Sequence, residues 1–215
     1  VTYHEDGRVA AITPKDGAPA VVTKRIIQDM DKSYFPVKTI IPSTEIVHDR
    51  VMLELFRGCI RGCRFCQAGM VYRPVREKSP EVVDCQCRAI FESSGYEEMS
   101  LSSLSISDYT KVNELTDSLL SWSNPNMVSL SLPSLRADSF TRELMDKVAS
   151  IRNSTITFAP EAGSQRLRDV INKNLQEEDL LEACKLAFAA GYNGVKLYFM
   201  MGLPTETDED LLGIS

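Results

Sequence analysis

Three cysteines, Cys59, Cys63 and Cys66, form a C-x3-C-x2-C motif directly after an apolar segment, residues 51–56. Cysteine thiolates are soft ligands, and a short loop with this spacing wraps around one compact inorganic core. Three thiolates ligate three irons of a cubane [4Fe-4S] cluster and leave the fourth iron open to bind a ligand. Gly58 and Gly62 allow the loop backbone to approach such a core closely. The motif therefore predicts a reactive iron–sulfur site.

Three other interpretations of the motif remain open. A structural zinc site would use His48 as its fourth ligand, although zinc knuckles favour paired C-x2-C units. The three thiols would otherwise be unrelated core residues, which a loop rich in glycine and arginine does not favour. An electron-transfer module would supply a fourth cysteine at suitable spacing, and the sequence offers none.

Phe65, placed immediately before the last cysteine of the motif, gives the strongest resemblance to a known family. The motif resembles that of the radical S-adenosylmethionine (SAM) superfamily. The segments APEAGSQRLRDVINKN and GLPTETDED are similar to an uncharacterised bacterial radical SAM family whose members carry a cobalamin-binding-like domain ahead of the barrel. The resemblance covers nearly the whole chain and indicates no substrate.

The resemblance implies a reaction and partners. The reduced [4Fe-4S] cluster would cleave SAM to methionine and a 5′-deoxyadenosyl radical, which abstracts hydrogen from an unknown substrate. RNA modification and cobalamin-assisted methylation are both compatible with it. A reductant such as flavodoxin or ferredoxin would supply the electron, and cobalamin would be bound by a domain outside this chain.

The resemblance also assigns residues to SAM. Phe65 matches the residue whose backbone meets the adenine, and Glu161 would hold the ribose hydroxyls or the methionine amine. Lys173 matches a basic position that pairs with the methionine carboxylate. Met200 and Gly202 match the apolar adenine contact and a tight turn. Alternatively, Glu161 and Lys173 would only stabilise the two ends of a helix through its dipole. The glycine–glycine–glutamate segment that usually binds the methionine amine is absent, so this contact is unassigned.

From residue 51 onward, apolar segments of strand and helix period alternate. Ser79 and Pro80 predict a helix start, and Gly95 predicts its end. Such alternation predicts right-handed βαβ units, a parallel sheet and the α/β class. The predicted strands are 51–56, 98–105, 127–132, 155–159 and 195–201, and the predicted helices are 80–94, 111–122, 139–149, 175–190 and one from 208.

With this alternation, the resemblance implies a partial TIM-like (β/α)6 radical SAM barrel that is truncated after about five strands. Ligands are then expected at the carboxyl ends of the strands. Serines alternate with apolar residues in strands 98–105 and 127–132, which favours a polar lumen over a solvated sheet face. We expect residues 51–215 to be the core, incomplete at its C-terminus. Residues 1–50, with a hairpin around Asp6-Gly7, are expected to be a β/loop extension from a missing upstream domain.

Composition and charge limit the partners and the cellular environment that we expect for the chain. A net charge of −6 argues against a broad nucleic-acid-binding surface. The chain has no apolar run long enough to span a membrane. Six cysteines with three in a cluster motif favour a reducing cytoplasm over a disulfide scaffold, and Cys87 and Cys184 fit the core.

The cysteine loop is a basic exception to this overall charge. Its cations either balance the charge of a cluster or bind an anionic substrate. The basic residues are Arg57, Arg61, Arg64, Arg73, Arg76 and Lys78.

Overall fold

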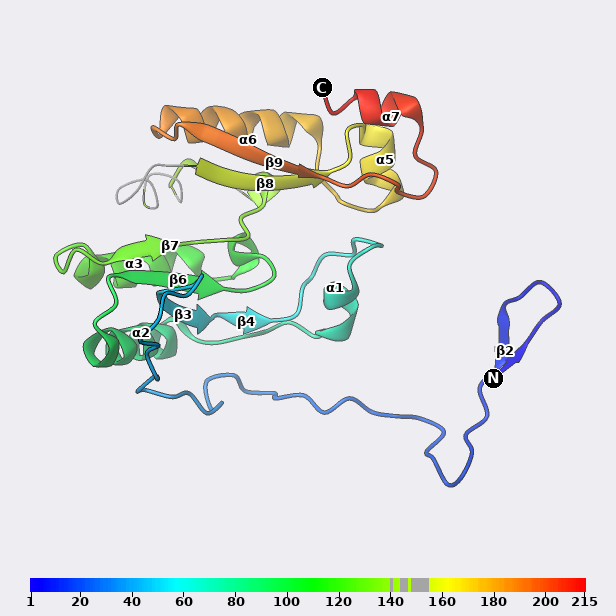
Figure 1. Ribbon diagram of the computed structural model, residues 1–215, viewed down its shortest axis with the longest axis horizontal. Helices are drawn as coiled ribbons and strands as arrows, with labels where there is room; N and C mark the ends of the chain where they lie inside the picture. The colour runs from blue at the N-terminus through cyan, green and yellow to red at the C-terminus, as the bar shows by residue number, and fades with distance from the viewer. Residues whose placement is uncertain (140, 144–146, 148–154) are drawn as a thin grey trace.

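The fold is an α/β arrangement of five parallel strands with helices packed against them (Figure 1). The computed structural model describes residues 1–139, 141–143, 147 and 155–215. Strands β3 (Val51–Glu54), β6 (Glu98–Ser102) and β7 (Ser129–Ser131) form one parallel sheet, in the order β3-β6-β7. Strands β8 (Thr155–Glu161) and β9 (Gly194–Phe199) form a second parallel pair. The predicted α/β class and strand–helix alternation are confirmed.

The two parallel sheets are not hydrogen-bonded to each other in the described part of the chain. The sequence predicted a single barrel wall, and β7 marks the break. This strand has only three residues, and Pro133 follows two positions later. Proline has no backbone N–H and ends sheet pairing.

Two helices cover one side of the three-stranded sheet: α2 (Pro80–Ser94) and α3 (Val112–Ser123). Helix α2 begins as predicted, because the Ser79 hydroxyl accepts a hydrogen bond from the Val82 N–H. It ends at Gly95, whose φ of 75° is in the left-handed region. Cys87 lies in the core, and burial raises the pKa of its thiol to about 12. Cys184, on helix α6 (Glu177–Ala189), packs against the same core, so both predictions are confirmed.

The two faces of the β3-β6-β7 sheet differ in polarity. Val51, Met99 and Leu130 lie side by side in register and are buried towards the helices. The next register positions, Met52, Ser100 and Ser131, share the opposite face. The predicted serine alternation is therefore present, and its polar side lies away from α2 and α3.

Short elements occupy the loops between these strands. An antiparallel pair, β4 (Phe56–Arg57) and β5 (Arg76–Glu77), brackets the cysteine loop and helix α1 (Gln67–Val71). Strand β6 ends at Ser102, not at 105 as predicted, and a 3-10 turn, Ile106–Asp108, follows after three further residues. The predicted helix 139–149 lies mostly outside the described residues; a 3-10 turn, Ala137–Ser139, precedes it.

Two short helices near the C-terminus complete the described fold. Helix α5 (Gln165–Val170), which was not predicted, follows β8, and α7 (Asp208–Leu212) lies beside it (Figure 1). Helix α5 packs on a small separate core that contains Ala162, Leu167 and Leu203, and Asp210 of α7 accepts a hydrogen bond from the Ser164 hydroxyl.

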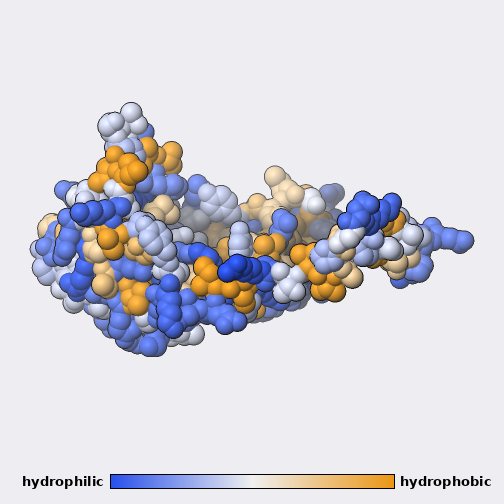
Figure 2. All heavy atoms as spheres, turned by 90° about the horizontal axis from the view of Figure 1, so that it is seen from below, coloured by the Kyte–Doolittle hydropathy of each residue, from blue (hydrophilic) through white to orange (hydrophobic). Residues whose placement is uncertain are grey.

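The N-terminal 50 residues lie largely along and beyond the body of the protein (Figure 1). Strands β1 (Thr2–Tyr3) and β2 (Val9–Ala11) form the predicted antiparallel hairpin. Residues 12–50, all of which the structure describes, form no helix or strand, yet Met30 is buried. Apolar side chains such as Ile12 and Val22 are exposed, and Figure 2 shows hydrophobic surface along this narrow extension. Among the described helices, none is both long and apolar enough to cross a membrane.

Candidate functional site

A cavity of about 270 Å³ lies at the carboxyl ends of the strands and collects most of the predicted site residues. We call it the cysteine cavity. Loops that follow β4, β6, β7 and β8 all contribute to it. Six of the eight predicted site residues line it: Cys59, Cys63, Phe65, Cys66, Glu161 and Lys173.

Met200 and Gly202 are not among the residues that line this cavity. They lie in the turn after β9, where the Met200 N–H donates to the Glu161 carbonyl at 2.8 Å. Gly202 has a φ of 84°, as expected for a tight turn. Met200 packs against the small core around Leu167. Met200 therefore supports the backbone of Glu161.

The cysteine loop is fixed by hydrogen bonds to the end of α5, about 110 residues later in the chain. The Arg64 N–H donates to the Ile171 carbonyl at 2.9 Å, and the Asn172 side-chain amide donates to the Gly62 carbonyl at 2.8 Å. A Cβ on Gly62 would lie 2.8 Å from that Asn172 nitrogen. Gly58 has a φ of 95°, and a Cβ there would lie 2.7 Å from the Pro74 carbonyl oxygen. Glycine is thus required at Gly58 by its φ and by nearby backbone, whereas at Gly62 the close atom belongs to a side chain, that of Asn172.

Two of the motif thiols accept hydrogen bonds from backbone N–H groups. The Cys59 Sγ accepts from the Arg61 N–H, and the Cys66 Sγ accepts from the Gly69 N–H, each at 3.4 Å. N–H groups directed at sulfur stabilise a thiolate and tune the potential of a cluster that it ligates.

The donor set fits an iron–sulfur cluster. All three thiols are partly exposed towards one cavity, and they come from a single short loop. Among the described residues, no three His, Cys, Asp or Glu side chains meet closely enough to hold one metal ion. A cluster does not require three side chains around a single metal ion, because each thiolate ligates a different iron. His48, the fourth ligand in the zinc interpretation, is exposed and is not part of the lining.

A network of charged side chains borders the cysteine cavity. The Arg61 guanidinium pairs with Asp108 at 2.5 Å and with Asp138 at 3.0 Å, and Arg136 pairs with Asp138 at 2.9 Å. Burial acts to raise the pKa of the Asp108 carboxyl, but hydrogen bonds from Arg61 hold it below its ordinary value. The same hydrogen bonds to Asp108 raise the pKa of Arg61.

This network joins three loops, those after β4, β6 and β7. Sequence reasoning noted Arg61 but did not find its partners, which lie 47 and 77 residues away. The usable signal was the position of Asp108 and Asp138 soon after two neighbouring parallel strands, whose carboxyl ends meet at one edge.

Glu161 and Lys173 pair with each other across the cavity wall. Their side-chain atoms are 3.2 Å apart, with 17% and 11% of the side chains exposed. Glu161 ends β8 with a φ of 70°, a conformation that non-glycine residues adopt mainly at functional or strained sites. Neither residue belongs to helix α5, which begins after Ser164 and ends before Ile171. A carboxylate and an ammonium side by side are complementary to the ammonium and carboxylate of an α-amino acid.

Comparison with known proteins agrees with this geometry. The model of the radical SAM superfamily matches residues 53–214. The chain belongs to the radical SAM superfamily. Enzymes of this superfamily use a [4Fe-4S] cluster and SAM.

A relative and two solved structures of radical SAM proteins are similar to it. The uncharacterized protein MJ0966 of Methanocaldococcus jannaschii is 36% identical over 210 residues, which are 97% of this chain and 45% of the relative. The radical SAM methyltransferase TsrM of Kitasatospora setae, solved with cobalamin and a [4Fe-4S] cluster bound, has a TM-score of 0.62 and 13% identity, with 75% of this chain and 33% of TsrM covered.

The apo form of the cobalamin-dependent radical SAM enzyme OxsB has a TM-score of 0.61 and 18% identity, with 76% of this chain and 25% of OxsB covered. At these identities the likeness shows the fold. The chain spans less than half the length of each of these three proteins.

Proposed function

We propose that Cys59, Cys63 and Cys66 hold a [4Fe-4S] cluster in the cysteine cavity, and that SAM binds beside it. The observation that carries this proposal is that the three motif thiols and the Glu161–Lys173 pair line one cavity. When bound and reduced, the cluster supplies the electron that splits SAM into methionine and a 5′-deoxyadenosyl radical.

Protein side chains would bind and orient SAM before this cleavage. Lys173 would pair with the methionine carboxylate, and Glu161 would accept hydrogen bonds from the methionine ammonium or the ribose hydroxyls. Their mutual pair keeps each charge compensated while SAM is absent. Lys173 is additionally held through its backbone carbonyl, which accepts a hydrogen bond from Arg136 at 3.1 Å.

The adenine contacts form a second part of the proposal. Phe65 is 38% exposed and lines the cavity, and it lies in the sequence between two of the proposed cluster ligands, Cys63 and Cys66. Met200 and Gly202 would approach the adenine from the turn after β9, next to Glu161.

The whole protein is proposed to contain more than this core. Residues 1–50 would connect the core to an upstream domain, which would bind cobalamin if the reaction resembles that of TsrM or OxsB. Methylation through cobalamin, sulfur insertion and RNA modification remain alternative outcomes of the hydrogen abstraction. A flavodoxin or ferredoxin would reduce the cluster in a reducing cytoplasm.

The experiment uses full-length protein, reconstituted anaerobically with iron and sulfide and incubated with SAM and dithionite. We expect 5′-deoxyadenosine in the wild type and none with Cys63→Ala, which removes one cluster ligand. Cys85→Ala is the matched control, because Cys85 is exposed on α2 and should leave the product unchanged. Equal product from Cys63→Ala would contradict the proposed cluster site.

A further inference from the structure

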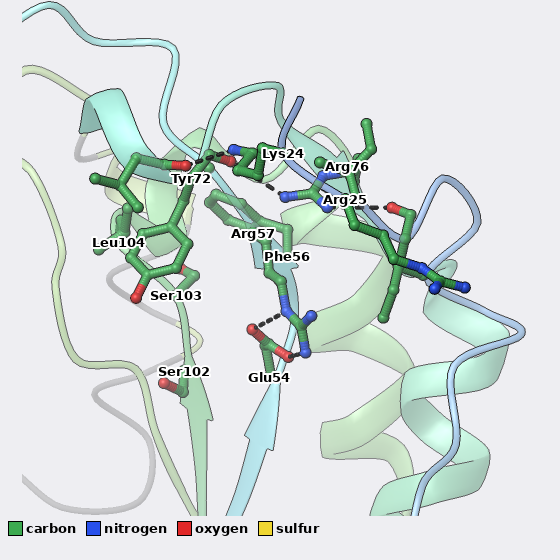
Figure 3. Close-up of a pocket in the computed structure, with 14 residues that line it drawn as sticks. Lys24, Arg25, Glu54, Phe56, Arg57, Tyr72, Arg76, Ser102, Ser103 and Leu104 are labelled. Carbon is green, nitrogen blue, oxygen red and sulfur yellow. Dashed lines mark hydrogen bonds and ion pairs between the residues drawn. The ribbon is translucent and has the colours of Figure 1, made fainter. Parts of the chain in front are cut away.

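A second cavity, about 680 Å³ in volume, is lined by residues from both ends of the cysteine loop and α1, among them Gly58 and Tyr72 (Figure 3). Its wall combines the end of β6, the β4–β5 pair and a stretch of the N-terminal segment around Lys24. We call it the cationic cavity. Gly58, which lines it, is the residue immediately before Cys59, and Leu104 lines both cavities. The two cavities are therefore neighbours that share one side-chain wall.

The cationic cavity carries an excess of positive charge. Lys24, Arg25, Arg57 and Arg76 line it, and Glu54 is the sole carboxylate among the described residues of its wall. Glu54 is already compensated, because both of its oxygens accept hydrogen bonds from Arg57, at 2.8 and 2.9 Å.

Lys24 and Arg76 contact neutral groups. The Lys24 ammonium donates to the carbonyls of Val71 and Arg73. The Arg76 guanidinium donates to the carbonyls of Ile27, Tyr72 and Pro74, at 3.0 to 3.2 Å. Figure 3 shows both side chains above the Arg57–Glu54 pair. Carbonyls orient these cations but do not cancel their charge, so both cations remain available to attract a bound anion.

The rest of the wall suits an organic body with an anionic group. Phe56 is buried beneath the cavity, and Tyr72 is 50% exposed. Ser103 also lines the wall, and its buried hydroxyl oxygen has no hydrogen-bond partner among the described residues. Aromatic surface, an unused hydroxyl and forked cations together match a small molecule with a phosphate or carboxylate group.

We propose that the cationic cavity binds the anionic group of a small organic substrate and presents its remaining part to the cysteine cavity past Leu104. This inference rests on the proposed function, since it assigns the substrate class of the same enzyme. It also gives two of the basic residues of the cysteine loop, Arg57 and Arg76, a role beyond balancing cluster charge.

The test measures binding by titration calorimetry on full-length protein, with phenyl phosphate, benzoate and the neutral benzyl alcohol as probes. We expect at least one anionic probe to bind and benzyl alcohol not to bind; the stronger of the two anions identifies the phosphate or carboxylate class. Lys24→Gln and Arg76→Gln should each weaken that binding about ten-fold, the loss expected for one hydrogen bond to a charged group. Lys185→Gln, an exposed lysine of α6, is the matched control and should bind as the wild type does.

Absence of binding by both anions, or equal binding by wild type, Lys24→Gln and Arg76→Gln, would overturn the proposal. Thermal melting checks each variant; if Arg76→Gln does not fold, Lys24→Gln alone decides, because Lys24 lies on an exposed segment. Formation of 5′-deoxyadenosine by the wild type is measured on the same preparation. Anion binding that depends on Lys24 without SAM cleavage would contradict the proposed function alone, and SAM cleavage without anion binding would contradict the cationic cavity alone.

Discussion

The helix-covered face of the β3-β6-β7 sheet and the loops at the carboxyl ends of its strands are held in place by different forces. On the sheet face, Leu53, Met99 and Leu101 are at most 1% exposed and pack against α2 and α3. In the loops, Arg61 joins Asp108 and Asp138 through charge-assisted hydrogen bonds.

The two kinds of contact differ because the sheet face needs stability, whereas the loops need a defined position and orientation. Apolar burial is strong but has no preferred direction, and the strands already have a backbone ladder that sets their register. The loops lack such a ladder, and forked hydrogen bonds from a guanidinium fix both distance and orientation. The site is thus positioned by directional contacts on a scaffold that is stabilised by packing.

The largest effect is expected on the apolar face. Leu53→Ala should lower the free energy of unfolding by about 2–5 kcal/mol, because it removes a buried side chain and leaves a cavity. Met52→Ala, one position along the same strand and 46% exposed, should cost less than about 1 kcal/mol. Urea unfolding of both variants checks this, and similar losses would break the contrast between the two faces of β3.

The second largest effect is expected in the charged network around Arg61. Arg61→Gln should lower the free energy of unfolding by about 2 kcal/mol at pH 7, because two poorly exposed carboxylates lose their main partner. The folded-state pKa of Asp108 lies below its unfolded value of about 3.9, so its contribution is present above that pH and is lost as the pH falls through the folded-state pKa.

Unfolding curves at pH 7 and pH 3 test both statements: the variant should differ from the wild type most at pH 7 and least at pH 3. Arg64→Gln is the control from the same loop, because the Arg64 guanidinium contacts a single carbonyl, that of Val170. A loss of stability from Arg61→Gln that is independent of pH would show that packing, and not charge, holds these loops.

A smaller effect is expected where backbones meet. A Cβ on Gly163 would lie 2.7 Å from the Ile214 nitrogen, and backbone atoms cannot move aside as a flexible side chain can. Gly163→Ala should therefore cost about 1–2 kcal/mol and weaken the contact between α5 and α7. Gly194→Ala, whose nearest contact would be 3.9 Å away, serves as control in thermal melts. Equal melting temperatures would show that α7 is not held tightly against this segment.

The smallest effect is expected at the surface of α2. Arg88 pairs with Asp84 at 2.6 Å and lies 4.8 Å from the centre of the Trp122 ring, with 43% of its side chain exposed. Arg88→Gln should cost about 0.5–1 kcal/mol, since exposed ion pairs and cation–π contacts are weak. A loss above about 2 kcal/mol in urea unfolding would mean that charge also stabilises the apolar side, and the contrast would disappear.

Elements with a strong local signal could be predicted from the sequence. Helix α2 has Ser79, Pro80 and Gly95 at its ends, and its bounds were predicted to the residue. Helix α5 has only six residues, too few for a periodic pattern, and it was missed. The break between β7 and β8 depends on hydrogen bonds between strands, which no local pattern encodes.

In the candidate site, too, features with a local sequence signal could be predicted and tertiary contacts could not. The three cysteines are close in sequence, so their common cavity follows from one loop. Glu161 and Lys173 were found through resemblance, and their mutual pair is a tertiary contact that periodicity does not contain. The roles of Met200 and Gly202 in SAM binding stay predictions, since both lie outside the cysteine cavity.

The contacts of Arg61 also limit how this enzyme could diverge. One guanidinium holds the loops after β4, β6 and β7 together, so an insertion in any of them would pull at least one partner away. The lengths of the three loops are therefore coupled, and change at one would have to be matched at the others. The segment around Lys24 is tied by its hydrogen bonds to the stretch from Val71 to Arg76, and not to the loops after β6 and β7 in the described contacts, so we expect adaptation to new substrates to occur first in that segment.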